Sequence, residues 1–242
     1  MDFVEFDKLF AASAERNGLV LPSEGARKKL HAFSEYLLEV NQSVNLTAIR
    51  NLPDVIDKHL VDSLMVAFFL PEGARILDLG CGPGFPSMPL AICRPDLSVF
   101  ALDSTAKKIH FLASAAEKCG VDNIFPVAGR AEDEKIRSEL GQFDFVVSRA
   151  VARMNVLCEL CLPYLKKGGK LLAMKGAIAE EELLEAKHAI QVLGGGDSAM
   201  IEQKLALADG SEEARAILSV TKAAPTPKSY PRAYAAILKK PL

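Results

Sequence analysis

An α/β fold with a doubly wound, mostly parallel sheet is the architecture that this sequence predicts. From residue 75 onward, short apolar runs of strand length alternate with segments of helical character. The first of these runs, 75–79, breaks directly into a glycine-rich turn, which is typical of a strand–turn–helix unit. Two strand-like runs near the end flank Asp209-Gly210, a hairpin-type turn, so an antiparallel hairpin is expected at one edge of the sheet.

The sheet and its helices can be assigned in chain order. The strands are expected at 75–79, 98–102, 124–127, 143–148 and 170–175, with the hairpin strands at 199–207 and 216–222. The helices between them are expected at 86–93, 105–119, 132–140, 154–165 and 178–193. Gly120 follows the second of these helices, where a glycine commonly caps a helix end.

The first 70 residues predict a helical extension that precedes the sheet. One helix is expected around 3–14. A second carries apolar residues at helical spacing and has Ser23 as its N-cap. A third is expected to begin at Pro53 and to run to about residue 70, with His59 and Asp62 on one face. This spacing alone favours a surface or capped histidine with Asp62 as its neighbour, and too few ligands lie nearby in the sequence for a metal site.

The chain therefore divides into a helical extension (1–70), a sheet domain (71–224) and a basic C-terminal tail (225–242). From Ala214 to Leu242 there are six Lys or Arg residues and no Asp or Glu. Interleaved tyrosines and prolines suit a flexible strap that binds phosphate, whereas a solvated tail is the simpler alternative.

Composition excludes several classes of protein. Half of the 242 residues are hydrophobic, and the net charge of −2 neither favours nor excludes nucleic acid. No apolar run approaches the ~20 residues of a membrane span, and the acidic N-terminus is unlike a signal peptide, so a cytoplasmic protein without membrane contact is expected. Five cysteines form no disulfide framework, and the Cys158-x-x-Cys161 pair lies in an apolar stretch, which favours core cysteines over metal or redox ligands.

The glycine-rich turn predicts a nucleotide-type site. Gly80, Gly82 and Gly84 follow the first strand as Gly-x-Gly-x-Gly, so the third glycine comes too early for the dinucleotide motif, and no Gly-Lys-Ser/Thr of a P-loop follows. Asp78 stands just before the turn, and Asp103 ends the next strand about 20 residues past the glycines, where a carboxylate can bind a ribose hydroxyl pair. A glycine turn without a ligand is the alternative.

Together these residues resemble the class I S-adenosylmethionine-dependent methyltransferases, which have a Rossmann-like sheet, and S-adenosylmethionine is the cofactor that this resemblance implies. Arg130, Arg149 and Lys175 follow other strands and are expected on the same rim, which suits a polyanionic substrate. The motifs of exocyclic-amine and pyrimidine-ring methylation are absent after the fourth strand. An acceptor with a free lone pair, such as guanine N7, is therefore expected, and catalysis would rest on alignment and electrostatics, with Arg130 and Lys175 as candidate catalytic residues.

A closer resemblance extends over nearly the whole chain. Its motifs are Asn45-Leu46-Thr47, His59-Leu60-Val61-Asp62-Ser63-Leu64, Asp78 to Pro86, Asp103-Ser104, Lys107-Lys108, Phe111-Leu112, Gly129-Arg130-Ala131-Glu132, Ser148-Arg149-Ala150, Met174-Lys175-Gly176 and Tyr230-Pro231-Arg232. In this order they resemble the bacterial 16S ribosomal RNA (guanine-N7) methyltransferase G family, also called glucose-inhibited division protein B. The resemblance implies methyl transfer to guanine N7 in 16S ribosomal RNA, as naked RNA or in the small subunit, by a protein expected to be a monomer.

The resemblance also implies roles for individual residues. The cofactor site would contain Asp78 and the loop glycines Gly80, Gly82 and Gly84, together with Phe85, Asp103, Ser104, Thr105, Ala131, Glu132 and Arg149. Lys107, Arg130, Lys175 and Arg232 would face RNA. The chain departs from the family pattern at Ser87, Ala235 and Ile237. A small-molecule methyltransferase and a non-enzymatic nucleotide-binding regulator remain as alternatives, and both predict no function for the basic tail.

Overall fold

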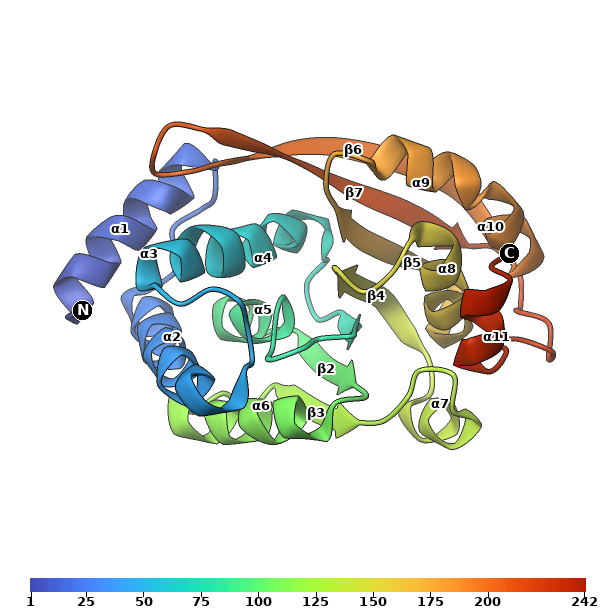
Figure 1. Cartoon of the computed structure of the whole chain (residues 1–242), viewed down its shortest axis with the longest axis horizontal. Helices are drawn as coiled ribbons and strands as arrows, with labels where there is room; N and C mark the ends of the chain where they lie inside the picture. Colours follow the sequence, from blue (N-terminus) through green and yellow to red (C-terminus); the bar gives the residue numbers. More distant parts are fainter.

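The computed structural model describes residues 1–242 and is built on a seven-stranded sheet in the order β3-β2-β1-β4-β5-β7-β6 (Figure 1). The strands are β1 (Arg75–Leu79), β2 (Ser98–Asp103), β3 (Ile124–Ala128), β4 (Phe143–Arg149), β5 (Leu165–Lys175), β6 (Gly195–Ala206) and β7 (Glu212–Lys222). The first five strands pair in parallel, and β7 is antiparallel to both β5 and β6. The predicted doubly wound sheet with a hairpin edge is thus confirmed.

Helices cover both faces of the sheet. The N-terminal helices are α1 (Phe3–Arg16), α2 (Glu24–Val44), α3 (Leu52–Val55), a π-helical turn (Ile56–Val61), α4 (Asp62–Leu64) and a 3₁₀ turn (Met65–Phe69). The remaining helices are α5 (Ser87–Cys93), α6 (Ala106–Cys119), α7 (Glu134–Leu140), α8 (Met154–Cys161), a 3₁₀ turn (Leu162–Tyr164), α9 (Ala179–Glu185), α10 (Lys187–Val192) and α11 (Tyr234–Lys239). Ser23 caps α2 as predicted, since its side chain accepts a hydrogen bond from the Ala26 amide.

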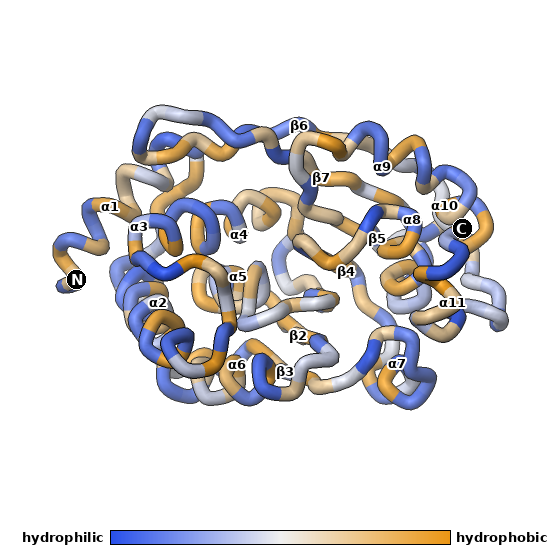
Figure 2. The backbone as a smooth tube through the Cα atoms, viewed as in Figure 1, coloured by the Kyte–Doolittle hydropathy of each residue, from blue (hydrophilic) through white to orange (hydrophobic).

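Alternating side chains of the strands divide the core into two layers. Ile76 of β1 belongs to a cluster shared with α1 to α6, and the next residue, Leu77, belongs to a cluster shared with α7 to α11. Figure 2 shows the hydrophobic colouring along β4 and α5 at the centre of the molecule. The helical extension is thus part of one core with the sheet, and the division at residues 70 and 224 stays a prediction.

Several elements differ from the prediction in length. Strands β5, β6 and β7 are longer than expected because they continue their pairing beyond the apolar runs, into polar stretches near the turns. The helix expected over 154–165 ends at Cys161, where Pro163 in the following 3₁₀ turn cannot supply an amide to continue it. The segment expected as one helix over 178–193 is divided into α9 and α10.

The C-terminal residues fold back onto the sheet domain, and α11 lies against α8 in Figure 1. Ile237 of α11 is completely buried. This differs from both sequence-based interpretations of the tail, a flexible strap and a solvated tail, because a buried anchor near its end fixes the segment. None of the helices has both the length and the apolar character that a membrane crossing requires.

Candidate functional site

The strand order reverses between β1 and β4, since β1 pairs with β2 on one side and with β4 on the other. Ligands of open parallel sheets bind outside the carboxyl ends of the strands at such a switch point. Two adjoining pockets lie there, a large pocket of about 750 Å³ and a small pocket of about 350 Å³. Both are lined by Gly80, Gly82, Lys108, Ala150 and Val151, so they form one continuous cleft.

The loop after β1 separates the two pockets, and its glycines are required for different reasons. Gly80 has φ +77°, and a Cβ there would lie 2.3 Å from Cγ2 of Val151, so no other residue fits. Gly82 has φ +56°, and a Cβ there would meet no atom within 4 Å. The main chain at Gly82 therefore borders open space, where a ligand can approach it closely.

Asp103 fixes this loop and lines the small pocket. One carboxylate oxygen accepts the Gly82 amide at 2.9 Å and the other accepts the Thr105 amide at 2.7 Å. A carboxylate has about four acceptor positions, so both oxygens keep capacity for hydroxyl groups of a ligand. Ser104, Thr105, Ala131 and Glu132 line the same pocket. The arrangement suits a ligand that has a sugar diol.

Asp78 and Gly84, although predicted to bind the cofactor, line neither pocket. Asp78 is fully buried under the loop, and one carboxylate oxygen accepts the Ser87 amide at 2.9 Å at the start of α5. Its other oxygen has no hydrogen-bond partner, and burial raises the pKa of Asp78 to about 7. A Cβ at Gly84 would lie 2.6 Å from Leu112. Both residues therefore support the loop from its buried side, whereas the sequence predicts that they bind the cofactor.

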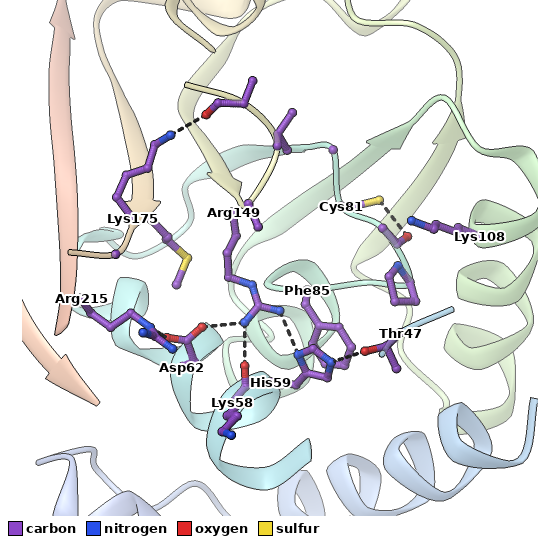
Figure 3. A pocket seen from close by; sticks show the side chains of 18 of the residues that line it. Thr47, Lys58, His59, Asp62, Cys81, Phe85, Lys108, Arg149, Lys175 and Arg215 are labelled. Atoms are coloured by element: carbon purple, nitrogen blue, oxygen red, sulfur yellow. Dashed lines mark hydrogen bonds and ion pairs between the residues drawn. The ribbon is translucent and has the colours of Figure 1, made fainter. Parts of the chain in front are cut away.

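The large pocket has an aromatic floor. The His59 ring is stacked on Phe85 with 4.2 Å between centroids and 18° between planes (Figure 3). Its Nε2 lies 2.8 Å from Oγ1 of Thr47, and its Nδ1 lies 3.2 Å from Nη2 of Arg149. Because the guanidinium can only donate, Nδ1 accepts and the proton of the neutral ring is on Nε2. Burial, together with the charge of Arg149, lowers the pKa of His59 to about 4.

His59 lies on the π-helical turn Ile56–Val61, which the i, i+3 spacing in the sequence does not predict. Such turns are rare and occur frequently at functional sites. The structure therefore answers the question that the sequence left open. His59 is neither a surface residue nor a partner of Asp62, but part of the pocket floor.

A buried ion-pair network stands behind this floor, with Asp62 at its centre. One oxygen of Asp62 accepts from Nη1 of Arg149 at 2.6 Å, and the other accepts from Nε of Arg215 at 2.8 Å (Figure 3). Arg149 also donates to the Lys58 carbonyl at 2.9 Å. The network joins α4, the end of β4 and β7. Sequence reasoning missed Arg215, because nothing near it in the chain indicates a partner 153 residues away.

The backbone turns sharply where β4 enters the cleft. Ala150 directly follows Arg149 and has φ +56°, a conformation that is uncommon for a residue other than glycine. Ala150 and Val151 line both pockets. Strained backbone of this kind gathers at ligand sites. The turn directs the chain across the boundary between the two pockets.

The cations predicted to face RNA differ in how exposed their side chains are and in whether a carboxylate already pairs with them. The amine of Lys175 lines the large pocket, but it is buried and donates to Glu182 at 2.6 Å and to the Ala152 carbonyl at 2.5 Å. The side chain of Arg130 at the small pocket is 61% exposed and lies 3.3 Å from Glu132. Lys107 is exposed and donates to the Val44 carbonyl. Arg232 lines neither pocket and pairs with buried Glu159.

Of the fifteen residues predicted to bind the cofactor or RNA, eleven line a pocket: Gly80 and Gly82 line both pockets, and each of the other nine lines one. Those at the small pocket are Asp103, Ser104, Thr105, Arg130, Ala131 and Glu132, and those at the large pocket are Phe85, Arg149 and Lys175. The residues that the prediction missed in the large pocket include Leu46, Thr47, Lys58 and Arg215. No group of three or more His, Cys, Asp or Glu residues that could hold a metal ion is present.

Comparisons with known proteins identify relatives of this chain. Residues 26–207 match the family model of the rRNA small subunit methyltransferase G. Ribosomal RNA small subunit methyltransferase G of Lactobacillus delbrueckii subsp. bulgaricus is 40% identical over 240 residues, which cover 97% of this chain and 99% of that protein. The protein of the same name from Lactobacillus acidophilus is 43% identical over 227 residues, covering 91% of this chain and 92% of that one.

Solved structures share the fold at low sequence identity. An O-methyltransferase from Bacillus cereus in complex with SAH has a TM-score of 0.57 and 18% identity, covering 90% of this chain and all of that one. M. jannaschii TYW2 in complex with AdoMet has a TM-score of 0.52 and 20% identity, covering 66% of this chain and 74% of that one.

Proposed function

Since the chain belongs to the rRNA small subunit methyltransferase G family, we propose that it transfers a methyl group from S-adenosylmethionine to N7 of a guanine in 16S ribosomal RNA. The observation that carries this proposal is the continuous cleft with two pockets of different chemistry. The small pocket suits the methyl donor, and the large pocket suits the acceptor base. The two reactants would then meet at the shared loop.

The residues of the small pocket fit the donor. Asp103 would bind the ribose hydroxyls, and the open main chain at Gly82 leaves room for close approach of the ligand. Ser104, Thr105, Ala131 and Glu132 would enclose the nucleoside part. S-adenosylmethionine supplies the methyl group, activated by the positive charge on its sulfur. We propose that Arg149, which lines the large pocket next to Ala150 of the shared boundary, binds the methionine part of the donor.

The chemistry of the large pocket favours an acceptor that needs no deprotonation. His59 is a poor base, because its pKa is lowered to about 4. Both oxygens of Asp62 are engaged by arginines, and Glu182 is paired with Lys175. Guanine N7 has a free lone pair and loses no proton when it attacks. The protein's task is then to hold acceptor and donor in line and to exclude water.

RNA would reach the large pocket across a rim of cations. We propose that the exposed side chains of Lys107 and Arg130 contact phosphates. Lys175 is paired with Glu182, so it would hold the wall of the large pocket in place rather than bind phosphate. We further propose that the protein acts as a monomer, because a single chain lines both pockets.

Methyl transfer to ribosomal RNA tests the proposal. The protein is incubated with tritiated S-adenosylmethionine and with small subunits, or naked 16S RNA, from a strain that lacks the protein. Nucleosides from the labelled RNA are then separated. Label in 7-methylguanosine is expected. Label in another nucleoside would contradict the N7 assignment, transfer only to small molecules would favour the rival methyltransferase, and cofactor binding without any transfer would favour a regulator.

A further inference from the structure

The basic C-terminal tail, 225–242, reaches the small pocket through Tyr234 rather than forming an open RNA-binding surface. Resting on the proposed function, we infer that this segment forms the outer wall of the donor site and that Tyr234 contacts the purine end of the methyl donor. The sequence, in contrast, indicated a flexible strap that binds phosphate. The structure supports the inference in three steps.

The first step is the orientation of the methyl donor in the cleft. Its methyl group must face the large pocket, where the acceptor binds, so its methionine end lies near Gly80 and Gly82, which both pockets share. Asp103 lies beyond this loop and suits the ribose. The purine must therefore occupy the part of the small pocket farthest from the large one. The residues that line only the small pocket include Ala131, Leu160 and Tyr234.

The second step is the local geometry of Tyr234. It begins α11 and lines the small pocket together with Leu160 of α8. The guanidinium of Arg130 lies 5.8 Å from the centroid of the Tyr234 ring, so the ring lies beside the loop that follows β3. An aromatic ring at the end of a nucleoside pocket offers a stacking or edge contact to any purine.

The third step is the ion pair between Arg232 and Glu159, called the clasp below, which fixes the tail on α8. Glu159 of α8 is completely buried, and both its oxygens are bound by Arg232. The Arg232 amide also donates to Glu159 at 2.8 Å, and Nη1 donates to the Lys240 carbonyl at 3.0 Å. Through these contacts Arg232 connects the residues before and after α11 to α8. The buried Ile237 lies on α11 between the two points of contact.

This clasp is hard to open. Removing Arg232 from Glu159 would leave a buried carboxylate without its counter-charge, which is strongly unfavourable. The guanidinium of Arg232 is therefore committed to the fold and has little charge left for phosphate. Its place in the sequence beside Tyr230 and Pro231 suggested RNA binding, but its contacts make it a positioning residue for Tyr234.

A fluorescence experiment tests the contact directly, because the chain has no tryptophan. Tyr234→Trp introduces a single indole, and S-adenosylhomocysteine is the probe. We expect its emission to change as the pocket fills, with a midpoint equal to the calorimetric Kd of the same variant. Tyr36→Trp is the matched control, since Tyr36 lines neither pocket and stacks on Phe111. Calorimetric binding with no change in the Tyr234→Trp emission would overturn the inference.

Affinities of the variants for S-adenosylhomocysteine distinguish a direct contact by Tyr234 from a purely structural role. Tyr234→Ala should weaken S-adenosylhomocysteine binding about tenfold, and Tyr234→Phe should restore it to within about twofold, because the ring face and not the hydroxyl makes the contact. Arg232→Gln, which breaks the clasp, should weaken binding to a similar degree while the thermal unfolding remains a single cooperative transition.

The outcomes distinguish this inference from the proposed function. A wild-type protein that does not bind S-adenosylhomocysteine would contradict the proposed function itself. Wild-type binding with unchanged affinity in both Tyr234→Ala and Arg232→Gln would overturn only the role of the tail. A change in the salt dependence of RNA binding in Arg232→Gln, with cofactor affinity intact, would return the tail to the RNA-binding interpretation.

Discussion

The two halves of the cleft are built in different ways. The small pocket is formed mainly by residues that directly follow strands β1, β2 and β3, and its defining contacts join Asp103 to amides of nearby loops. The large pocket collects residues from α2–α3, β4, β5 and β7, and buried ion pairs hold it together. One half therefore depends on local backbone geometry, and the other on charge pairs between distant segments.

This difference predicts different responses to substitution. Changes in the small pocket should alter donor affinity and leave the fold intact, because loops at strand ends tolerate change at their solvent side. Changes to the ion-pair network of the large pocket should alter stability first, because a buried charge that loses its partner is costly.

The largest expected effect is that of Asp62→Ala, which leaves Arg149 and Arg215 without their shared carboxylate. We expect the free energy of unfolding to fall by about 3 kcal/mol, as for other broken buried pairs. Urea denaturation measures this change. Glu213→Ala is the matched control, because Glu213 pairs with the same Arg215 at the exposed end and should cost at most about 1 kcal/mol. Equal effects would contradict the central position given to Asp62.

A smaller effect of pH is expected from Asp78, beneath the glycine loop. Burial raises its folded-state pKa to about 7, whereas the unfolded-state value is about 4. Between these values the folded protein binds a proton that the unfolded chain has lost, so this contribution to stability falls as pH rises from about 4 to 7. Asp78→Asn cannot ionise and should lose this dependence.

Denaturation of Asp78→Asn and of the wild-type protein at several pH values checks this expectation. The stability of the variant relative to wild type should increase between pH 5 and pH 7, by up to about 1.4 kcal/mol per pH unit. A difference between the two proteins that stays constant over this interval would mean that Asp78 is ionised throughout.

The smallest effect concerns Lys107, an exposed residue of α6 that lines neither pocket. If Lys107 contacts a phosphate, Lys107→Ala should reduce the slope of log affinity for RNA against log salt by up to about 0.7–0.9. Lys135→Ala serves as control, since Lys135 is exposed on α7, which packs on the opposite face of the sheet from α6. Identical slopes for wild type and both variants would remove Lys107 from the RNA-binding surface.

The same contrast explains how far the sequence could predict the structure. The order of strands and helices, the glycine turn and Asp103 follow from periodicity and short spacings, and these features determine the small pocket. The pairing of Asp62 with Arg215 and of Glu159 with Arg232 depends on how distant segments pack, and no local pattern indicates it.

Asp78 and Arg232 show the limit of assigning roles by motif position. Each stands in a segment that predicted a ligand contact, but Asp78 points under the loop and Arg232 toward α8. Sequence spacing indicates which element carries a residue, whereas the direction of the side chain depends on the packing around it. His59 is the opposite case, because a π-helical turn brings it into the pocket against its expected spacing.

Calorimetric binding of S-adenosylhomocysteine to two variants, measured side by side, tests the division of the cleft most directly. Asp103→Ala removes the carboxylate of the small pocket and should weaken binding by about 10- to 100-fold, since a charge-assisted bond to ribose hydroxyls contributes roughly 1.5–3 kcal/mol. Lys58→Ala removes a charge from the large pocket and should leave the affinity unchanged. Unchanged binding in Asp103→Ala, or an equal loss in Lys58→Ala, would contradict the assignment of donor and acceptor to separate pockets.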